Sequence, residues 1–260
     1  MSQKVNSVIS IRGVKIGEGI PKICVPIVGT SKEDVLQEAN QIKEIKCDIV
    51  EWRMDCYEDV EQIEKVKELL QELRRCIKEK LILVTFRTTS EGGTKELSKA
   101  SYRELLIEVV KTKLADLIDV ELFIGDELVI EIIKIAHENE SYIIASNHDF
   151  NKTPSKEEII TRLGKMQDLG ADILKIAAMP QTEMDVITLL AATREMVDQH
   201  ANRPVVTMSM AGTGVISRLA GELTGSAITF GAAAKASAPG QLKATAMEAI
   251  LTTLHEALLR

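Results

Sequence analysis

Short runs of apolar and β-branched residues recur along the chain, and stretches with the apolar spacing of an amphipathic helix separate them. Near-continuous apolar runs of four to eight residues are typical of parallel strands that helices cover. The pattern predicts eight such strands, at 22–28, 47–55, 81–87, 117–122, 142–149, 173–179, 204–210 and 227–231. The chain is therefore expected to repeat a strand-then-helix unit.

Helix-boundary signals between these runs support the alternation. The segment 31–45 starts with Ser31 in an N-cap position and Asp34 three residues on. The segment 155–170 has Ser155 with Glu158 as its capping-box partner and Gly170 as a C-terminal stop. Both segments are predicted to be helices that follow a strand.

Eight units without a Pro/Gly/Ser-rich linker predict a closed α/β fold, the (β/α)8 TIM barrel, as a single domain over residues 1–260. An open, doubly wound sheet is the alternative, but no GxGxxG turn follows the first strand. Residues 1–21 form an extension in which 7–19 alternates in polarity, with Gly13 at a turn. This extension is predicted to be a short β-hairpin that closes the bottom, or N-terminal end, of the barrel.

Composition narrows the class of protein. The 260 residues are 45% hydrophobic and 27% charged, as in an ordinary globular protein, and the net charge of −7 argues against a nucleic-acid partner. The four cysteines, Cys24, Cys47, Cys56 and Cys76, have neither a CxxC pair nor zinc-like histidine spacing, which predicts free thiols and no metal. No apolar run has the length of a signal peptide or a membrane span, so a cytoplasmic protein without a membrane partner is expected.

Ionisable residues gather where the predicted strands end. Active sites of (β/α)8 barrels lie at the C-terminal ends of the strands and in the loops that follow them. The candidates at these positions are Glu51, Arg53, Arg87, Glu91, Asp119, Glu121, His148, Lys175, Arg218, Ser237 and Gln241.

Lys175 lies inside a predicted strand, between Leu174 and Ile176, with no acidic neighbour in that strand. Burial disfavours the charged ammonium, and a neutral amine can attack a carbonyl to form a Schiff base. A lysine whose stem covers apolar surface while its head reaches solvent is the alternative. The neighbouring strand, which ends in His148, favours chemistry.

His148 is the one histidine that ends a predicted strand. Because neighbouring parallel strands lie about 4.8 Å apart, His148 and Lys175 can reach one substrate. An imidazole with an ordinary pKa of about 6.5 suits proton abstraction next to an iminium. A histidine that merely caps the strand end is equally consistent with this position.

Three arginines at strand ends, Arg53, Arg87 and Arg218, predict a convergent anion site, although each alone would more often be a surface charge. Glu51 is two residues before Arg53, where it could orient that arginine, accept a substrate hydroxyl or form a structural ion pair. Glu91, in the sequence SEGG, could tune the histidine or be a solvated loop carboxylate.

Asp119 and Glu121 are two carboxylates on one predicted strand. Carboxylates in such a pattern suggest a metal site only weakly when a lysine and arginines are near. We therefore predict an ion-pair network here.

Several motifs together resemble the type I 3-dehydroquinate dehydratase family over nearly the whole chain. They are DIVEWRMD, TFRTTSEGG, SNHDF, ILKIA and SAPGQ. The resemblance implies a β/α barrel, commonly a homodimer, that acts in the shikimate pathway of aromatic amino acid biosynthesis without a metal or organic cofactor. It implies a lyase that converts 3-dehydroquinate to 3-dehydroshikimate.

The resemblance also implies a role for nine of these candidates, all except Asp119 and Glu121. Lys175 matches the Schiff-base lysine, His148 the residue that removes the adjacent proton and then protonates the leaving hydroxyl, and Glu91 the acid beside it. The remaining matches are to substrate-binding residues: Glu51, Arg53 and Arg87 for the ring hydroxyls, and Arg218, Ser237 and Gln241 for the carboxylate. Ser237 and Gln241 would lie on a loop that closes over the site.

Two other functions are consistent with a barrel-strand lysine. A class I Schiff-base aldolase would commonly use a phosphorylated sugar, and Gly212 and Gly214 resemble a phosphate loop. Arg218 and the SAPGQ motif favour a carboxylate instead. A non-enzymatic binding barrel would form no imine.

Overall fold

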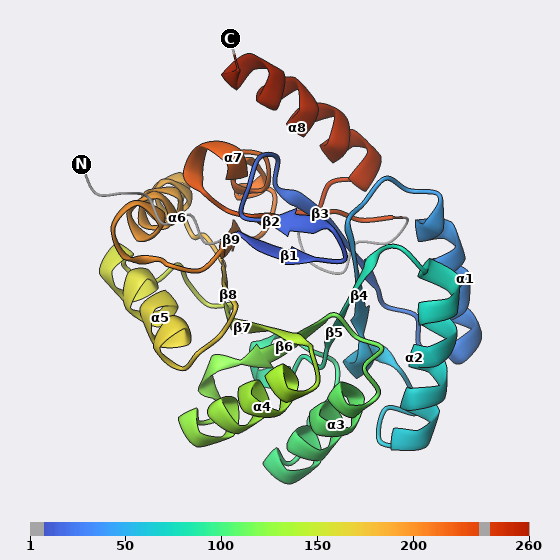
Figure 1. Cartoon of the computed structure of the whole chain (residues 1–260). Helices are drawn as coiled ribbons and strands as arrows, with labels where there is room; N and C mark the ends of the chain where they lie inside the picture. Colours follow the sequence, from blue (N-terminus) through green and yellow to red (C-terminus); the bar gives the residue numbers. More distant parts are fainter. Residues whose placement is uncertain (1–7, 234–239, 260) are drawn as a thin grey trace.

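The protein, represented by a computed structural model that describes residues 8–233 and 240–259, has a ring of parallel strands with helices outside it (Figure 1). The eight predicted strands are confirmed, with every boundary within two residues. They are β3 Lys22–Ile27, β4 Ile49–Arg53, β5 Leu81–Thr85, β6 Leu117–Glu121, β7 Tyr142–Asp149, β8 Ile173–Ala178, β9 Val205–Ser209 and β10 Ile228–Phe230.

Helices surround the ring (Figure 1). They are α1 Lys32–Lys43, α2 Ile63–Ile77, α3 Lys99–Lys111, α4 Asp126–Glu138, α5 Lys156–Asp168, α6 Glu183–Glu195, α7 Gly221–Thr224 and α8 Ala244–Leu258. The predicted capping box of Ser31 and Asp34 is confirmed at the start of α1. Ser155 caps α5 as predicted. The predicted capping box with Glu158 is wrong, because the carboxylate of Glu158 accepts from Arg162 and not from the backbone of Ser155.

The sheet closes into a barrel. Its strand order is β10-β3-β4-β5-β6-β7-β8-β9, and all neighbours are parallel. The two ends of this order meet where the amide of Ala227 donates to the carbonyl of Val205 at 2.8 Å. The (β/α)8 barrel is confirmed, and the doubly wound alternative is wrong because its sheet would stay open.

Polarity changes along the barrel axis. Inward-facing residues alternate along each strand, and those near the strand starts are apolar, such as Ile49, Leu117 and Ile173. Two residues further along the same faces come polar side chains, such as Glu51 and Lys175. The barrel is therefore filled with hydrocarbon at its N-terminal end and with ionisable groups at its C-terminal end.

The predicted N-terminal hairpin is also confirmed. Strands β1 Ile9–Ile11 and β2 Val14–Ile16 are antiparallel, and Arg12 and Gly13 between them both have positive φ, as a type I′ turn requires. Ile11 and Ile16 pack in one apolar cluster with the inward residues of the strand starts. The hairpin thus closes the N-terminal end of the barrel; Figure 1 shows it across the ring of strands.

The four cysteine thiols are free, and Cys24 is buried while the other three are partly exposed. Within residues 8–233 and 240–259, no helix has the length and apolarity needed to cross a membrane.

Candidate active site

A pocket opens at the C-terminal ends of the strands, with an empty volume of about 720 Å³ that includes space open to solvent. Eight of the nine predicted site residues line it: Glu51, Arg53, Arg87, Glu91, His148, Lys175, Arg218 and Gln241. The ninth, Ser237, lies outside the described residues. Residues from six strands and the loops after them thus meet at one place, as the barrel topology predicts.

Lys175 comes from the inner face of β8, and its side chain is only 4% exposed. Its Nζ lies 3.2 Å from Oδ2 of Asp119 on β6, and 4.7 Å from the centre of the Phe230 ring on β10. The sequence predicted burial but did not show this acidic partner, which is 56 residues away in the chain. A carboxylate and an aromatic face therefore hold the ammonium.

His148, at the end of β7, is oriented by Glu91. Oε2 of Glu91 lies 2.9 Å from Nδ1 of His148 and accepts its backbone amide at 2.9 Å, while Oε1 accepts from Asn147 at 3.1 Å. Burial, together with the charges of Arg87 and Lys175, lowers the pKa of His148 well below its usual value. We assign the proton of the neutral imidazole to Nδ1, which donates to Glu91 and leaves Nε2 as a base.

Glu91 owes its position to a tight turn. It ends the 3₁₀ segment Thr89–Glu91, and the amide of Gly93 donates to the carbonyl of Thr88 at 2.8 Å. A Cβ on Gly93 would lie 1.8 Å from the carbonyl oxygen of Arg87, so only glycine allows this approach. Burial raises the pKa of Glu91 to about 7, although Arg87 acts in the opposite direction.

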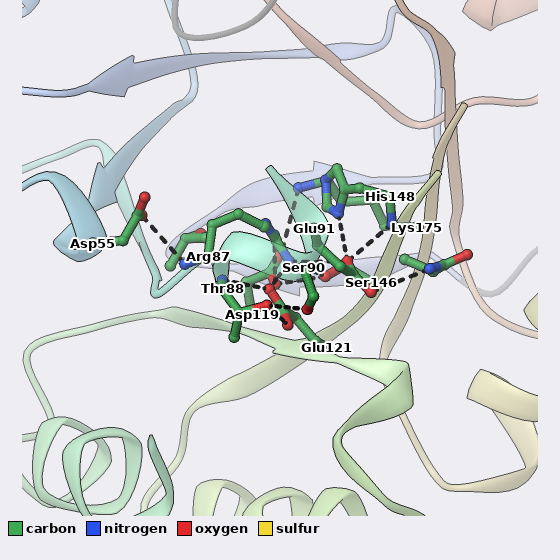
Figure 2. Close-up of polar contacts among 12 residues, drawn as sticks. Asp55, Arg87, Thr88, Ser90, Glu91, Asp119, Glu121, Ser146, His148 and Lys175 are labelled. Atoms are coloured by element: carbon green, nitrogen blue, oxygen red, sulfur yellow. Dashed lines mark hydrogen bonds and ion pairs between the residues drawn. The ribbon is translucent and has the colours of Figure 1, made fainter. Parts of the chain in front are cut away.

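Arg87 is the centre of a buried ion-pair network (Figure 2). Its NH2 donates to Oδ1 of Asp119 at 2.8 Å, and its NH1 donates to Glu121 at 2.9 Å and to Ser146 at 3.0 Å. Glu121 also accepts the amide of Thr88 at 2.9 Å. The predicted ion-pair network of Asp119 and Glu121 is confirmed, and Arg87 is part of it as well as of the pocket wall.

Arg53 is oriented by Asp55, which the sequence analysis missed. Its Nε and NH2 each donate to one oxygen of the buried Asp55 at 2.8 Å, and Asp55 also accepts the amide of Thr94. Glu51, for which three roles were open, accepts a hydrogen bond from Thr85 at 2.8 Å. Asp55 could have been suspected from the same two-residue spacing that drew attention to Glu51.

Arg218 lies at the end of a 3₁₀ segment after β9, Val215–Arg218, with only 2% of its surface exposed. Its NH1 is 3.4 Å from the carbonyl of Phe230, and burial lowers its pKa to about 10. Because burial opposes the charge of a guanidinium, an anionic ligand in the pocket would stabilise this side chain. Gln241 lines the same pocket.

Apolar side chains complete the pocket and were not predicted. They are Phe150, Ala177, Met208, Met210 and Phe230. Ala177 is two residues beyond Lys175 on β8, and Met208 and Met210 are two residues apart. The alternation of inward and outward side chains was therefore the available signal for three of them.

Comparison with known proteins gives one consistent result. Residues 23–257 match the family model described as type I 3-dehydroquinase. The chain is 55% identical over 249 residues to the 3-dehydroquinate dehydratase of Clostridium botulinum (strain Eklund 17B / Type B), covering 96% of this chain and 98% of that protein. It is 50% identical over 250 residues to the enzyme of the same name from Bacillus subtilis (strain 168), covering 96% and 98%.

A solved structure agrees with these sequences. The crystal structure of type I 3-dehydroquinate dehydratase from Clostridium difficile with covalently modified comenic acid has a TM-score of 0.94 and 53% identity, covering 96% of this chain and 98% of that one. The 3-dehydroquinate dehydratase from Geobacillus kaustophilus HTA426 has a TM-score of 0.94 at 34% identity, covering 98% and 99%.

Proposed function

This chain belongs to the type I 3-dehydroquinase family, and from that premise we propose that Lys175 is the residue that forms the Schiff base with the substrate. The enzyme is a lyase of the shikimate pathway that dehydrates 3-dehydroquinate. The family assignment favours dehydration over the aldolase and the binding barrel. The observation that carries the residue assignment is that Lys175 and His148, on neighbouring strands, line one pocket.

The proposed reaction begins at the amine of Lys175. The amine attacks the ketone of 3-dehydroquinate, and the oxygen leaves as water to give an iminium. Nε2 of His148 removes a proton from the adjacent carbon; the electron pair of that C–H bond forms a double bond to the iminium carbon, and the C=N π pair moves onto nitrogen to give an enamine. The imidazolium then protonates the leaving hydroxyl, which departs as water. Hydrolysis of the conjugated iminium releases 3-dehydroshikimate and restores Lys175.

Glu91 keeps the imidazole of His148 in the tautomer that this sequence needs. The carboxylate accepts the Nδ1 proton at 2.9 Å, which leaves Nε2 available to the substrate. When His148 becomes an imidazolium, the same carboxylate stabilises its charge. Glu91 thus belongs to the proposed catalytic set without touching the reacting carbon.

The substrate-binding residues divide according to the substrate group that each is proposed to bind. Arg218 is proposed to bind the carboxylate, with Gln241 and Ser237 beside it. Glu51, Arg53 and Arg87 are proposed to face the ring hydroxyls. The burial of Arg218 and the bidentate grip of Asp55 on Arg53 support this division, because both fix a guanidinium before the substrate arrives.

Three wider expectations also remain proposals. We propose a single domain over residues 1–260, a homodimer and a cytoplasmic location. The exposed leucines Leu223, Leu254 and Leu258 support the homodimer; they lie on α7 and α8, which a hydrogen bond between His255 and Glu222 joins.

Loss of the amine tests the proposal. Lys175→Ala should abolish formation of the enone, followed by its absorbance. Lys134→Ala, which removes an exposed lysine of α4, should keep the wild-type rate. A Lys175→Ala enzyme that retained a rate within about tenfold of wild type would remove Lys175 from the mechanism, since covalent catalysis leaves no substitute for its nucleophile.

A further inference from the structure

We propose that Asp119 is a positioning residue for the reacting nitrogen: its buried carboxylate holds Nζ of Lys175 from the free ammonium through to the iminium. The inference rests on the proposed role of Lys175 and adds a residue for which the sequence predicted only an ion pair.

The geometry divides the two oxygens of Asp119 between two tasks. Oδ1 accepts from the hydroxyl of Ser146 at 2.6 Å and from NH2 of Arg87 at 2.8 Å. Oδ2 accepts from Nζ of Lys175 at 3.2 Å. Because two donors fix Oδ1, the carboxylate cannot rotate, and Oδ2 stays directed at the lysine (Figure 2).

Register and strand tilt place Asp119 at the height of Lys175. Glu121 pairs with Ser146, and Ser146 pairs with Lys175. Because the strands of an eight-stranded barrel are tilted, this line of paired residues rises towards the C-terminal end by about one residue per strand from β8 to β6. Asp119, two residues before Glu121 on the inner face of β6, therefore lies level with Lys175 and reaches its Nζ from the side, while Lys175 lines the pocket.

Asp119 is suited to be a lasting anion. It is fully buried, and although burial alone would raise its pKa, Arg87 and Lys175 hold the pKa below the usual value. A carboxylate that stays ionised does not store the proton of the lysine. It acts as a fixed acceptor and counter-ion.

The chemistry needs such an acceptor at each stage. When the ammonium loses one proton, an N–H bond can still donate to Asp119, which directs the lone pair to the ketone. The proton that the ammonium loses is balanced by the proton that the carbinolamine hydroxyl takes up when it leaves as water. Ammonium plus ketone thus gives iminium plus water, and the nitrogen carries one positive charge at both ends. The iminium N–H again has Oδ2 as its acceptor.

The other groups around Lys175 differ from Asp119 in their placement. The titratable and charged groups that face it are Cys24 on β3, Glu51 on β4, Arg87 on β5, His148 on β7 and Arg218 after β9. Among the described residues, Asp119 is the carboxylate at hydrogen-bond distance from Nζ. Glu121 belongs to the same network through Arg87 and Thr88 and does not pair with Lys175, which makes it the matched control.

The test measures adduct formation as a function of pH. Enzyme and 3-dehydroquinate are mixed at each pH and quenched into buffered borohydride after set times. Mass spectrometry then measures the fraction of enzyme that carries the reduced adduct. Asp119→Asn should lower the plateau rate of adduct formation about ten- to a hundredfold, because the amine is no longer aimed. The acid limb of the profile, where the rate falls as pH decreases, should move to lower pH because the ammonium loses its counter-ion.

The controls separate this role from general support of the network. Glu121→Gln also removes a carboxylate from Arg87, but it should leave the acid limb where it is in wild type. Asp119→Glu keeps the charge and displaces it, so its limb should stay while its plateau falls; this variant keeps the test valid if Asp119→Asn does not fold.

Two outcomes would overturn the inference. One is an acid limb that stays at the wild-type pH in Asp119→Asn. The other is an acid limb that Glu121→Gln moves as far as Asp119→Asn does. A wild-type enzyme that forms no adduct at Lys175 would instead refute the proposed function itself.

Discussion

At the scale of single residues, the surroundings move the pKa values of two neighbours in opposite directions. Burial lowers the pKa of His148 well below its usual value and raises that of Glu91 to about 7. The imidazole therefore stays neutral, while the carboxylate that accepts its Nδ1 proton is ionised only above about neutral pH. The state proposed to be active is the neutral histidine with ionised Glu91.

This pair predicts a pH dependence. Activity should be present above about pH 7 and lost as pH falls through it, because protonated Glu91 no longer accepts from Nδ1. Glu91→Gln should lower kcat and abolish this limb, since an amide does not titrate. A profile of kcat against pH for both enzymes measures it. A limb near pH 7 that persisted unchanged in Glu91→Gln would belong to another group.

Arg218 allows a second test of the binding set. If it binds the substrate carboxylate, Arg218→Ala should raise KM about ten- to 150-fold, as expected for one charge-assisted hydrogen bond of roughly 1.5–3 kcal/mol. Arg218→Lys should recover only part of this, because a point charge does not reproduce the fork of a guanidinium. If Arg218→Ala lowered thermal stability with KM nearly unchanged, Arg218 would be a structural residue.

The sequence was sufficient for some of these residues and insufficient for others. Lys175 and His148 stood out because ionisable side chains within apolar runs are unusual. The partners of Lys175 and Arg53 did not stand out. Asp119 and Phe230 reach the lysine through strand register and ring closure, and the apolar pattern of a single strand contains neither. Asp55 is only two residues from Arg53 and was still missed, because its burial depends on the loop that carries Thr94.

At the scale of elements, strands were easier to predict than the segments that carry the chemistry. Each strand is a nearly continuous run of apolar residues, and every strand boundary lies within two residues of its prediction. The turn that carries Glu91 has no such pattern. Its shape depends on the close approach of Gly93 to the carbonyl of Arg87, a contact that the spacing of apolar residues does not encode.

Gly93→Ala should therefore disturb both stability and catalysis. Its Cβ would meet backbone, which does not yield as a flexible side chain would, so the turn must shift and carry Glu91 with it. We expect a lower melting temperature and a fall in kcat larger than any change in KM. Gly164→Ala on α5 is the control, because a Cβ there meets nothing within 4 Å and alanine favours the helix by about 1 kcal/mol. A Gly93→Ala enzyme with wild-type stability and kcat would contradict this account of the turn.

At the scale of the whole molecule, ring closure unites residues from distant parts of the chain. Strand β10 pairs with β3 on one side and meets β9 on the other, which brings Phe230 to Lys175. The hairpin and the apolar layer above it fill one end of the barrel, so polar side chains collect at the other. Eight alternating units were enough to predict this architecture, because consecutive parallel strands with right-handed crossovers have few ways to close.

The proposed homodimer is testable at this scale. Light scattering after size exclusion should give twice the 28.6 kDa of the chain, since the leucines on α7 and α8 expose apolar area that association would remove from water. A mass of one chain at every concentration would contradict it.

The central claim is that the reaction passes through an imine on Lys175, and one measurement tests it most directly. Wild-type enzyme is incubated with 3-dehydroquinate, reduced with borohydride, digested and analysed by peptide mass. The account predicts a stable adduct on the peptide that contains Lys175 and on no other. An adduct on a different lysine, or an unmodified protein under conditions of full turnover, would contradict it.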